Sequence, residues 1–146
     1  GKKQDTAGLE IISFLESKFD LKIERYLIIP DEPLKIKQTV EDFTQSGIDL
    51  ILTCGGTGIS PRDVTPETIK PMLTKELIGM MEAARAYGQN RTPFAMLSRG
   101  IAGFIDQTFI MCLPGSTRGA RETLDALFPQ AFHVFKVRNI NYKHQD

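Results

Sequence analysis

The sequence predicts an α/β fold: a three-layer sandwich with a mostly parallel central sheet and one small β-hairpin. Short apolar runs alternate with amphipathic helical stretches along the 146 residues, which is the pattern of strands joined by crossover helices. Gly, Pro and capping residues bound most of these stretches. The length suits one domain, so we predict a single domain over 1–138 and a polar tail over 139–146.

Capping residues and apolar spacing predict the helices. Asp5 or Thr6 caps a helix from about 8 to 18. A second helix over 32–46 stops at Gly47, and a third begins at Pro66 with Thr65 as its cap. The remaining helical stretches are 76–88, a helix that starts after Ser116 or Thr117 and reaches 128, and 131–137.

The strands are predicted from short apolar runs. A run over 21–29 is stopped by Pro30. The nearly continuous run 48–52 is typical of a strand buried on both faces, and 93–97 is a further candidate strand. The runs 101–105 and 108–113 flank Asp106-Gln107, which favours a β-hairpin.

Composition excludes several classes of function. Lys plus Arg and Asp plus Glu are both 18, so the formal net charge is zero, and binding to nucleic acid through general electrostatics is not expected. No apolar run approaches the roughly 20 residues of a membrane helix, and the first residues have no signal-peptide character. We therefore expect a cytoplasmic protein with no membrane partner. Cys54 and Cys112 both end apolar runs and are expected to be buried free thiols.

Three loops follow predicted strands, at 30–32, 55–63 and 114–118. In open α/β sheets, ligands bind outside the carboxyl ends of the strands. These loops are rich in Gly or polar residues. The sequence therefore predicts a ligand site where they meet at one edge of the sheet.

The middle loop, within TCGGTGISPRDVTPE (53–67), is the strongest feature. Gly55, Gly56 and Gly58 let backbone N–H groups approach an anion. Thr57 adds a hydroxyl, and Arg62 offers a planar donor suited to phosphate. The motif is neither a Walker A loop nor a GxGxxG dinucleotide motif. A tight turn that needs glycines, followed by a capped helix, explains the loop equally well.

Two carboxylates follow predicted strands at the same edge, those of Asp31 and Asp63. Such a pair beside a Gly-rich loop is suited to Mg²⁺-assisted phosphoryl or nucleotidyl chemistry. Asp31 is alternatively a helix cap before Pro33. Asp63 alternatively orients the substrate that accepts the transferred group or stabilises its own loop.

The third loop places Pro114, Gly115 and Ser116 at a helix N-terminus, where exposed N–H groups and the helix dipole favour an anion. Arg118 and Arg121 add positive charge. An ordinary helix start with a solvated basic face is the alternative. Ser98-Arg99-Gly100, residues 98–100, is a shorter segment of similar character that, taken alone, is a surface turn.

Four segments together resemble the molybdopterin adenylyltransferase family: IPDE (29–32), TCGGTGISPRDVTPE (53–67), LSRG (97–100) and LPGSTRGARETL (113–124). This domain also occurs in the plant cofactor-assembly protein and in the G domain of gephyrin. The resemblance extends from residue 5 to about 137. The middle motif is specific, because its glycines, Arg-Asp and Thr-Pro-Glu fall in register.

The resemblance implies an α/β fold, a homotrimer, and transfer of AMP from Mg-ATP to the terminal phosphate of molybdopterin, with release of pyrophosphate. Mg²⁺ is the implied metal, ATP and molybdopterin are the substrates, and other molybdenum cofactor assembly enzymes are further expected partners. The family's two functional aspartates, which are also the expected metal ligands, match Asp31 and Asp63. Its phosphate loop and further binding segments match Gly55, Gly56, Thr57, Gly58, Ser98, Pro114, Gly115 and Ser116. Arg62 is a further predicted binding residue because of its planar donor.

The motifs leave alternatives open: a molybdopterin-binding homologue without strong turnover, a scaffold module, and a nucleotidase that cleaves a dinucleotide or pyrophosphate. One departure from the family pattern also matters. Family members open with an apolar strand before the stretch that matches 5–8, and this sequence starts after that point. We therefore expect the sheet of residues 1–146 to lack one strand near its middle.

Overall fold

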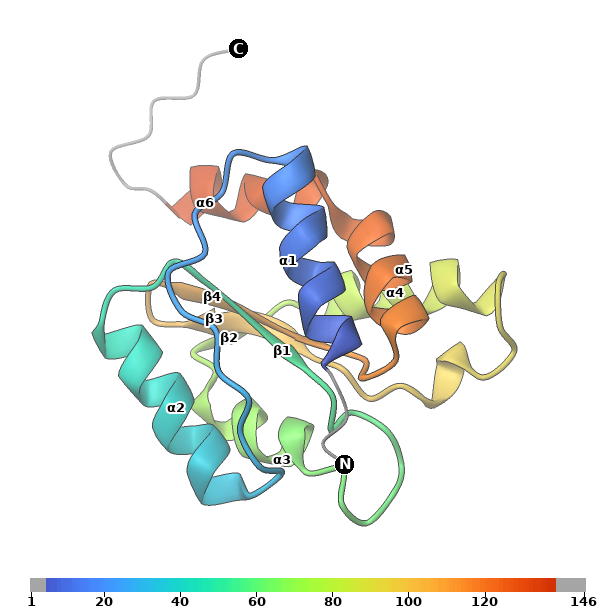
Figure 1. Cartoon of the computed structure of the whole chain (residues 1–146), viewed down its shortest axis with the longest axis horizontal. Coiled ribbons are helices and arrows are strands. Elements are labelled where there is room, and N and C mark those ends of the chain that lie inside the picture. Colours follow the sequence, from blue (N-terminus) through green and yellow to red (C-terminus); the bar gives the residue numbers. More distant parts are fainter. Residues whose placement is uncertain (1–4, 139–146) are drawn as a thin grey trace.

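The structure, a computed structural model, describes residues 5–138; the predicted tail at 139–146 lies outside the described residues (Figure 1). The helices are α1 (Thr6–Lys18), α2 (Pro33–Gln45), α3 (Thr65–Ile69), α4 (Ile78–Gln89), α5 (Thr117–Leu127) and α6 (His133–Arg138). The strands are β1 (Leu50–Cys54), β2 (Lys75–Glu76), β3 (Ala102–Ile105) and β4 (Thr108–Leu113). Short 3-10 turns lie at Lys70–Met72, Ala95–Leu97 and Gln130–Phe132.

The sheet is mixed rather than mostly parallel, so that part of the fold prediction is wrong. Its order is β1-β4-β3-β2. Only β1 and β4 are parallel, with Leu50 opposite Phe109, while β3 pairs antiparallel with both β4 and β2. The predicted β-hairpin over 101–113 is confirmed, and it lies inside the sheet. Because a tight turn at Asp106, which has φ +51°, can join only antiparallel strands, the hairpin reverses the strand direction.

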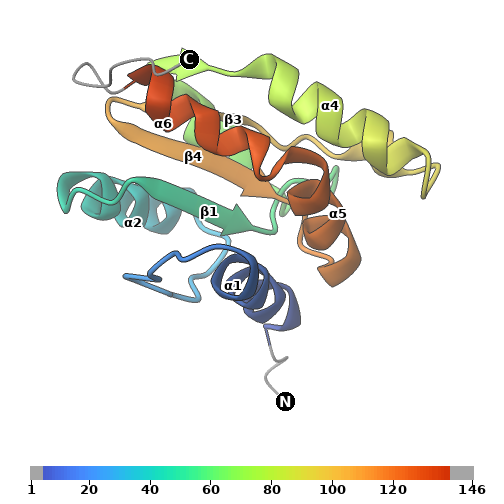
Figure 2. The ribbon, with the colours of Figure 1, turned by 90° about the horizontal axis from the view of Figure 1, so that it is seen from above.

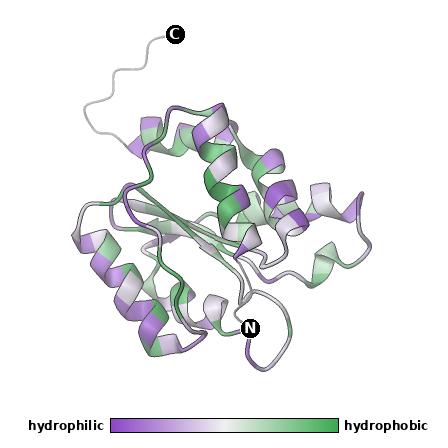
Figure 3. Ribbon diagram, viewed as in Figure 1, coloured by the Kyte–Doolittle hydropathy of each residue, from purple (hydrophilic) through white to green (hydrophobic). Residues whose placement is uncertain are grey.

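Helices cover both faces of the sheet, which confirms the predicted three-layer sandwich (Figures 1 and 2). One core joins α1, α4 and α5 to the sheet through residues such as Phe14, Met81 and Leu124. The core on the other face contains Ile36 of α2 and Ile69 of α3. Hydrophilic and hydrophobic residues both colour α2, as expected for a helix with one buried side (Figure 3).

Two strands are buried on both faces: all four residues of β3 and all six residues of β4 are buried. This role was predicted for the run 48–52, but β1 is only partly buried and its last residue, Cys54, is exposed. β1 lies at the edge of the described sheet and has one neighbour, β4. Of the two predicted buried thiols, only that of Cys112 is buried, and burial raises the pKa of this thiol to about 11.

The predicted strand at 21–29 is not a strand in the structure. This stretch lies outside any helix or strand, and a groove of about 1450 Å³ is lined by both this segment and β1. A ladder cannot form across such a groove, because hydrogen-bonded strands lie about 5 Å apart. The predicted strand at 93–97 is also wrong. Its last three residues form a 3-10 turn, and Phe94 is 70% exposed.

The helix predictions hold to within one or two residues. The Asp5 carboxylate accepts a hydrogen bond of 3.0 Å from the Gly8 N–H, which confirms its cap on α1. Ser116 caps α5, and α2 is followed by Gly47 at φ +81°. The cap predicted at Thr65 is wrong, because α3 begins at that residue and its hydroxyl bonds elsewhere. None of the helices within residues 5–138 is long and apolar enough to cross a membrane.

Candidate functional site

The carboxyl ends of β1 and β4 bring two of the predicted loops together. Because these strands are parallel neighbours, Cys54 lies opposite Leu113 and both chains leave the sheet at the same edge. The Gly55 N–H donates to the Leu113 carbonyl over 2.9 Å. A Cβ added to Gly115 would lie 3.1 Å from the Gly55 Cα. The middle and third loops therefore meet backbone to backbone, as predicted.

The turn after β1 requires glycine for two separate reasons. Gly55 and Gly56 have φ values of +102° and +71°, a region that other L-residues enter only with strain. A Cβ on Gly56 would also collide with the Thr65 hydroxyl. That hydroxyl donates to the Gly55 carbonyl over 3.2 Å, and the Thr65 N–H donates to the Gly56 carbonyl over 3.1 Å. The turn is thus fixed to the start of α3.

Four consecutive backbone N–H groups in this loop, from Gly56 through Thr57 and Gly58 to Ile59, donate to no acceptor within residues 5–138. Successive free N–H groups in a turn form a concavity that binds anions. They follow directly on Gly55, whose backbone touches the loop that leads into α5. Thr57 itself is 3% exposed. Its backbone N–H, and not its predicted hydroxyl, is therefore the group that we consider for anion binding.

Asp63 is folded back onto its own loop. Its Oδ2 accepts a hydrogen bond of 2.9 Å from the Ser60 N–H, and the Asp63 N–H donates to the Ser60 carbonyl over 2.9 Å. The same oxygen would lie 2.8 Å from a Cβ on Gly58. Among the roles that the sequence left open for Asp63, these hydrogen bonds directly support stabilisation of the loop.

Asp31 occupies a different environment. It is exposed, and it lines the groove beside β1 together with Gly55. Within residues 5–138, Asp31 and Asp63 share no hydrogen-bond partner, and no group of three or more His, Cys, Asp or Glu comes together that could hold a metal. Such a donor set fits Mg²⁺ only where substrate phosphates supply most of the oxygen ligands.

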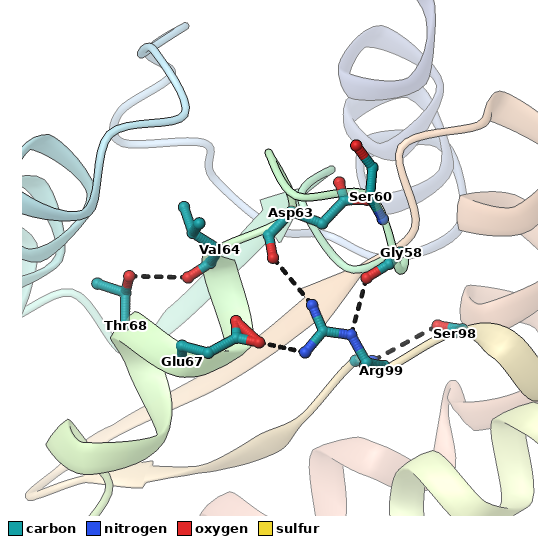
Figure 4. Close-up of polar contacts among 9 residues, drawn as sticks. Gly58, Ser60, Asp63, Val64, Glu67, Thr68, Ser98 and Arg99 are labelled. Carbon is teal, nitrogen blue, oxygen red and sulfur yellow. Dashed lines mark hydrogen bonds and ion pairs between the residues drawn. The ribbon is translucent and has the colours of Figure 1, made fainter.

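Arg99 is the residue of this site that sequence reasoning missed. Its Nε donates to the Gly58 carbonyl over 2.7 Å, a terminal nitrogen donates to the Asp63 carbonyl over 2.9 Å, and the other forms an ion pair with Glu67 (Figure 4). Its backbone N–H donates to the Thr57 carbonyl over 2.8 Å. One residue of the 97–100 segment thus holds both ends of the Gly-rich loop.

No sequence signal marks this role, because a lone Arg in a polar turn is usually a solvated surface residue. The turn itself is held by Arg85, which donates to the carbonyls of Ser98 and Gly100 over 3.4 and 3.3 Å. The predicted site residue Ser98 therefore lies beside Arg99. The hydrogen bond from Arg99 lowers the pKa of the Glu67 carboxyl.

The basic side chains at the start of α5 are engaged in ion pairs. Arg118 pairs with Glu122, and Arg121 pairs with Glu10 and Asp125. The expected positive face at this helix is therefore largely balanced by carboxylates. Ser116 caps the helix by accepting from the Gly119 N–H over 3.0 Å. By contrast, Arg62 is exposed, and its guanidinium has no partner among the described residues.

The fold and this site together define an α/β sandwich with a glycine-rich turn at the carboxyl edge of its sheet, whose backbone N–H groups from Gly56 to Ile59 donate to no acceptor within residues 5–138. Residues 1–133 match the family model described as a probable molybdopterin binding domain. The chain belongs to this family.

Relatives and solved structures agree with this membership. The chain is 45% identical over 137 residues to a molybdenum cofactor biosynthesis bifunctional protein of Chlorobaculum tepidum, covering 94% of this chain and 44% of the relative. It is 40% identical to gephyrin of Dictyostelium discoideum, covering 92% of this chain and 20% of the relative. The chain thus spans less than half the length of these two curated relatives.

A third relative is closer in length. It is the molybdenum cofactor biosynthesis protein B of Staphylococcus aureus, 35% identical, with 89% of this chain and 80% of the relative covered. The structure resembles that of the molybdopterin biosynthesis enzyme MoaB of Thermus thermophilus, with a TM-score of 0.86 and 43% identity over 92% of this chain and 85% of that one. The tungsten cofactor synthesizing protein MoaB of Pyrococcus furiosus gives 0.85 and 32% identity, with 94% of this chain and 87% of that one covered.

Proposed function

We propose that the chain acts in molybdenum cofactor biosynthesis and transfers AMP from Mg-ATP to the terminal phosphate of molybdopterin. The observation that carries this proposal is the run of four free N–H groups from Gly56 to Ile59 at the joined ends of β1 and β4. Such a run binds a phosphate without side-chain contacts. We infer that the substrate is molybdopterin because the chain belongs to the family described as a probable molybdopterin binding domain.

The chemistry suits a site built mostly from backbone. An oxygen of the acceptor phosphate attacks the α-phosphorus of ATP, a new P–O bond forms, and the bond to the β-phosphate breaks to release pyrophosphate. Because the acceptor phosphate is already ionised, no general base is needed. The protein must align the in-line attack and neutralise developing charge. Backbone N–H groups and the unpaired guanidinium of Arg62 suit this task.

In this proposal Mg²⁺ binds together with ATP. The carboxylates of Asp31 and Asp63 are not equally available to contact the ion. Asp31 is exposed and has no hydrogen-bond partner among the described residues, so its oxygens are available. One oxygen of Asp63 is already used by the Ser60 N–H. Asp31 is therefore the better candidate to contact the ion, and Asp63 acts mainly by shaping the loop.

A second candidate function is molybdopterin binding without turnover. The different surroundings of the two carboxylates favour it: Asp31 lines the groove beside β1, Asp63 bonds to its own loop, and the two have no common hydrogen-bond partner within residues 5–138. In that case the phosphate loop would retain the pterin, while ATP would not react.

The test is incubation of the purified protein with molybdopterin and Mg-ATP, followed by mass detection of adenylylated pterin and an assay for pyrophosphate. We expect both products from the wild type. Bound pterin without either product would contradict adenylyl transfer and support the second candidate.

Two variants at one position separate the roles of Asp63. Asp63→Asn keeps an oxygen that can accept from the Ser60 N–H, whereas Asp63→Ala removes it. We expect Asp63→Ala to lose most turnover and Asp63→Asn to keep a substantial part of it. Equal loss in both would indicate that the charge is required. Asp42→Asn, which removes the charge from a surface ion pair with Arg25 and keeps an acceptor oxygen, is the matched control for Asp63→Asn.

Assembly and location remain proposals as well. A homotrimer and contacts with other cofactor-assembly enzymes follow from the family resemblance, and two relatives are longer proteins, one of them named as bifunctional. We propose the cytoplasm as the location. Size-exclusion chromatography with light scattering tests the trimer, because a monomer mass would contradict it.

A further inference from the structure

We propose that Arg99 is a positioning residue that aims the free N–H groups of Gly58 and Ile59 at a phosphate group of the substrate. This inference rests on the proposed function for the identity of the substrate, but its geometric part stands alone. Arg99 lies outside the Gly-rich loop and reaches it from the 97–100 turn (Figure 4). It therefore acts on the ligand through the loop's backbone.

The planarity of the peptide unit determines where the N–H groups of Gly58 and Ile59 point. In a trans peptide, the carbonyl of one residue and the N–H of the next point in opposite directions. The Arg99 backbone N–H binds the Thr57 carbonyl, and its Nε binds the Gly58 carbonyl. Both carbonyls therefore point toward Arg99, so the N–H groups of Gly58 and Ile59 point away from it.

Within residues 5–138, no other hydrogen bond fixes these two peptide planes. Glycine at Gly58 leaves the backbone free to rotate, and the side chain of Ile59 is 69% exposed and gains no support from packing. Within residues 5–138, the carbonyls of Thr57 and Gly58 accept only from Arg99. Without the guanidinium, the plane that carries the Ile59 N–H loses the only hydrogen bond that it makes among the described residues.

The guanidinium is itself held in position by two further contacts. One terminal nitrogen donates to the Asp63 carbonyl over 2.9 Å, and the other pairs with Glu67 on α3. The planar fork of Arg makes all three contacts at once, whereas the single ammonium of Lys cannot reproduce their directions. Lysine at this position should therefore retain charge and lose positioning.

The test measures phosphate binding separately from turnover. Inorganic pyrophosphate is titrated into ¹⁵N-labelled protein, and the amide signals of residues 56–59 are followed for the wild type, Arg99→Ala, Arg99→Lys and Glu67→Gln. In the wild type, we expect pyrophosphate to shift these signals. In Arg99→Ala, we expect the apparent Kd for pyrophosphate to rise at least tenfold. Arg99→Lys should raise it to a similar extent. Glu67→Gln, which keeps a hydrogen-bond acceptor for the guanidinium, should stay within about threefold.

Turnover then identifies which phosphate the loop holds. With molybdopterin and Mg-ATP, the KM of the substrate held by the loop should rise at least tenfold in Arg99→Ala, while the KM of the other substrate should stay within about twofold. Free guanidinium at a non-denaturing concentration should partly restore the KM. A residue that only stabilises the fold would instead lower the active fraction without this split between KM values. Lys37→Ala, which removes an exposed ion pair with Glu41 on α2 away from the groove, is the control.

The outcomes separate this inference from the proposed function. Equal pyrophosphate shifts and Kd in wild type and Arg99→Ala would overturn the inference, as would a wild type in which the signals of 56–59 do not respond. Weaker binding in Arg99→Ala, with no adenylyl transfer by the wild type, would support the inference and contradict the proposed function. If Arg99→Ala does not fold, Arg99→Lys gives the same comparison.

Discussion

At the scale of single residues, the site depends on a turn that only glycine can make. Gly56 combines a left-handed backbone with direct contact to the Thr65 hydroxyl, and Gly55 lies against the backbone of Gly115. Each contact joins the Gly-rich loop to a different neighbour. The position of the free N–H groups is therefore set by the tight packing of backbone atoms around two residues without side chains.

We expect Gly56→Ala to destabilise the protein by about 2 kcal/mol or more. The left-handed conformation costs roughly 1–2 kcal/mol for a residue with a Cβ, and Thr65 must also move. Gly79→Ala is the control, because Gly79 lies in the first turn of α4 and a Cβ there meets nothing within 4 Å. That change should be neutral or stabilise by a few tenths of a kcal/mol. Urea unfolding of both variants measures the difference, and equal values would contradict the strain at Gly56.

The Glu67–Arg99 pair predicts a local dependence on pH. The hydrogen bond from Arg99 lowers the pKa of Glu67 from its usual 4.5. The pair therefore contributes fully above about pH 4.5, and its contribution is lost as the pH falls through the lower pKa of the folded state. The side chains of Arg99 and Glu67 are 37% and 55% exposed, and exposed ion pairs contribute little to global stability. We therefore expect protonation of Glu67 to change the loop and not to unfold the protein.

The measurement is the NMR signal of the Arg99 Nε–H, followed from pH 7 to pH 3. We expect it to shift with a midpoint below 4.5, without global unfolding at that midpoint. Glu67→Gln should remove the titration. An unchanged titration in Glu67→Gln would mean that another carboxylate is responsible.

At the scale of elements, the site is made by the ends of β1 and β4 and by the start of α5. β4 is buried on both faces, and its register against β1 brings Leu113 opposite Cys54. α5 then begins two residues after Gly115, with Ser116 as its cap. The cap thus stabilises the helix and fixes where the third loop lies.

We expect Ser116→Ala to destabilise the protein by about 1 kcal/mol, because the Gly119 N–H loses its acceptor. Ser17→Ala is the control. The Ser17 hydroxyl bonds the Ser13 carbonyl on the exposed side of α1, so its removal should change the free energy of unfolding by less than about 0.5 kcal/mol. Thermal unfolding of both variants tests the cap. A loss in Ser17→Ala as large as that in Ser116→Ala would contradict the assignment.

At the scale of the whole molecule, two cores on opposite faces of the sheet hold the site in place. Leu124 is fully buried in the core that joins α1, α4 and α5 to the sheet. Cys112 of β4 is 1% exposed and belongs to the other core. A change on one face should therefore be detectable on the other if the layers unfold together.

We expect Leu124→Ala to lower the free energy of unfolding by about 2–5 kcal/mol. In a Cys54→Ser background, which removes the exposed thiol, alkylation of Cys112 should then accelerate by the matching factor. Leu34→Ala at a position 66% exposed is the control and should change neither quantity appreciably. Unchanged Cys112 labelling in a destabilised Leu124→Ala protein would show that the two cores open independently.

Local chemistry in the sequence determined the elements that are stabilised locally. The caps Asp5 and Ser116, the hairpin at Asp106-Gln107 and the class of fold were all predicted, because each depends on neighbouring residues or on periodicity. The meeting of the middle and third loops at one edge of the sheet was predicted from the rule on strand ends, and the structure adds the contact between Gly55 and Gly115. The roles of Asp31, Asp63 and the other matched residues in catalysis stay predictions.

Tertiary structure alone decided the rest, because long-range pairing has no local signature. The apolar run 21–29 has strand-like composition, but it lies across a groove from β1 and forms no strand. The hairpin of β3 and β4 lies inside the sheet, and its position makes the sheet mixed. The contacts of Arg99 cross 41 residues to Gly58 and 36 to Asp63. Only the folded structure shows that Arg99, from a distant segment of the sequence, contacts this loop at Gly58 and at Asp63.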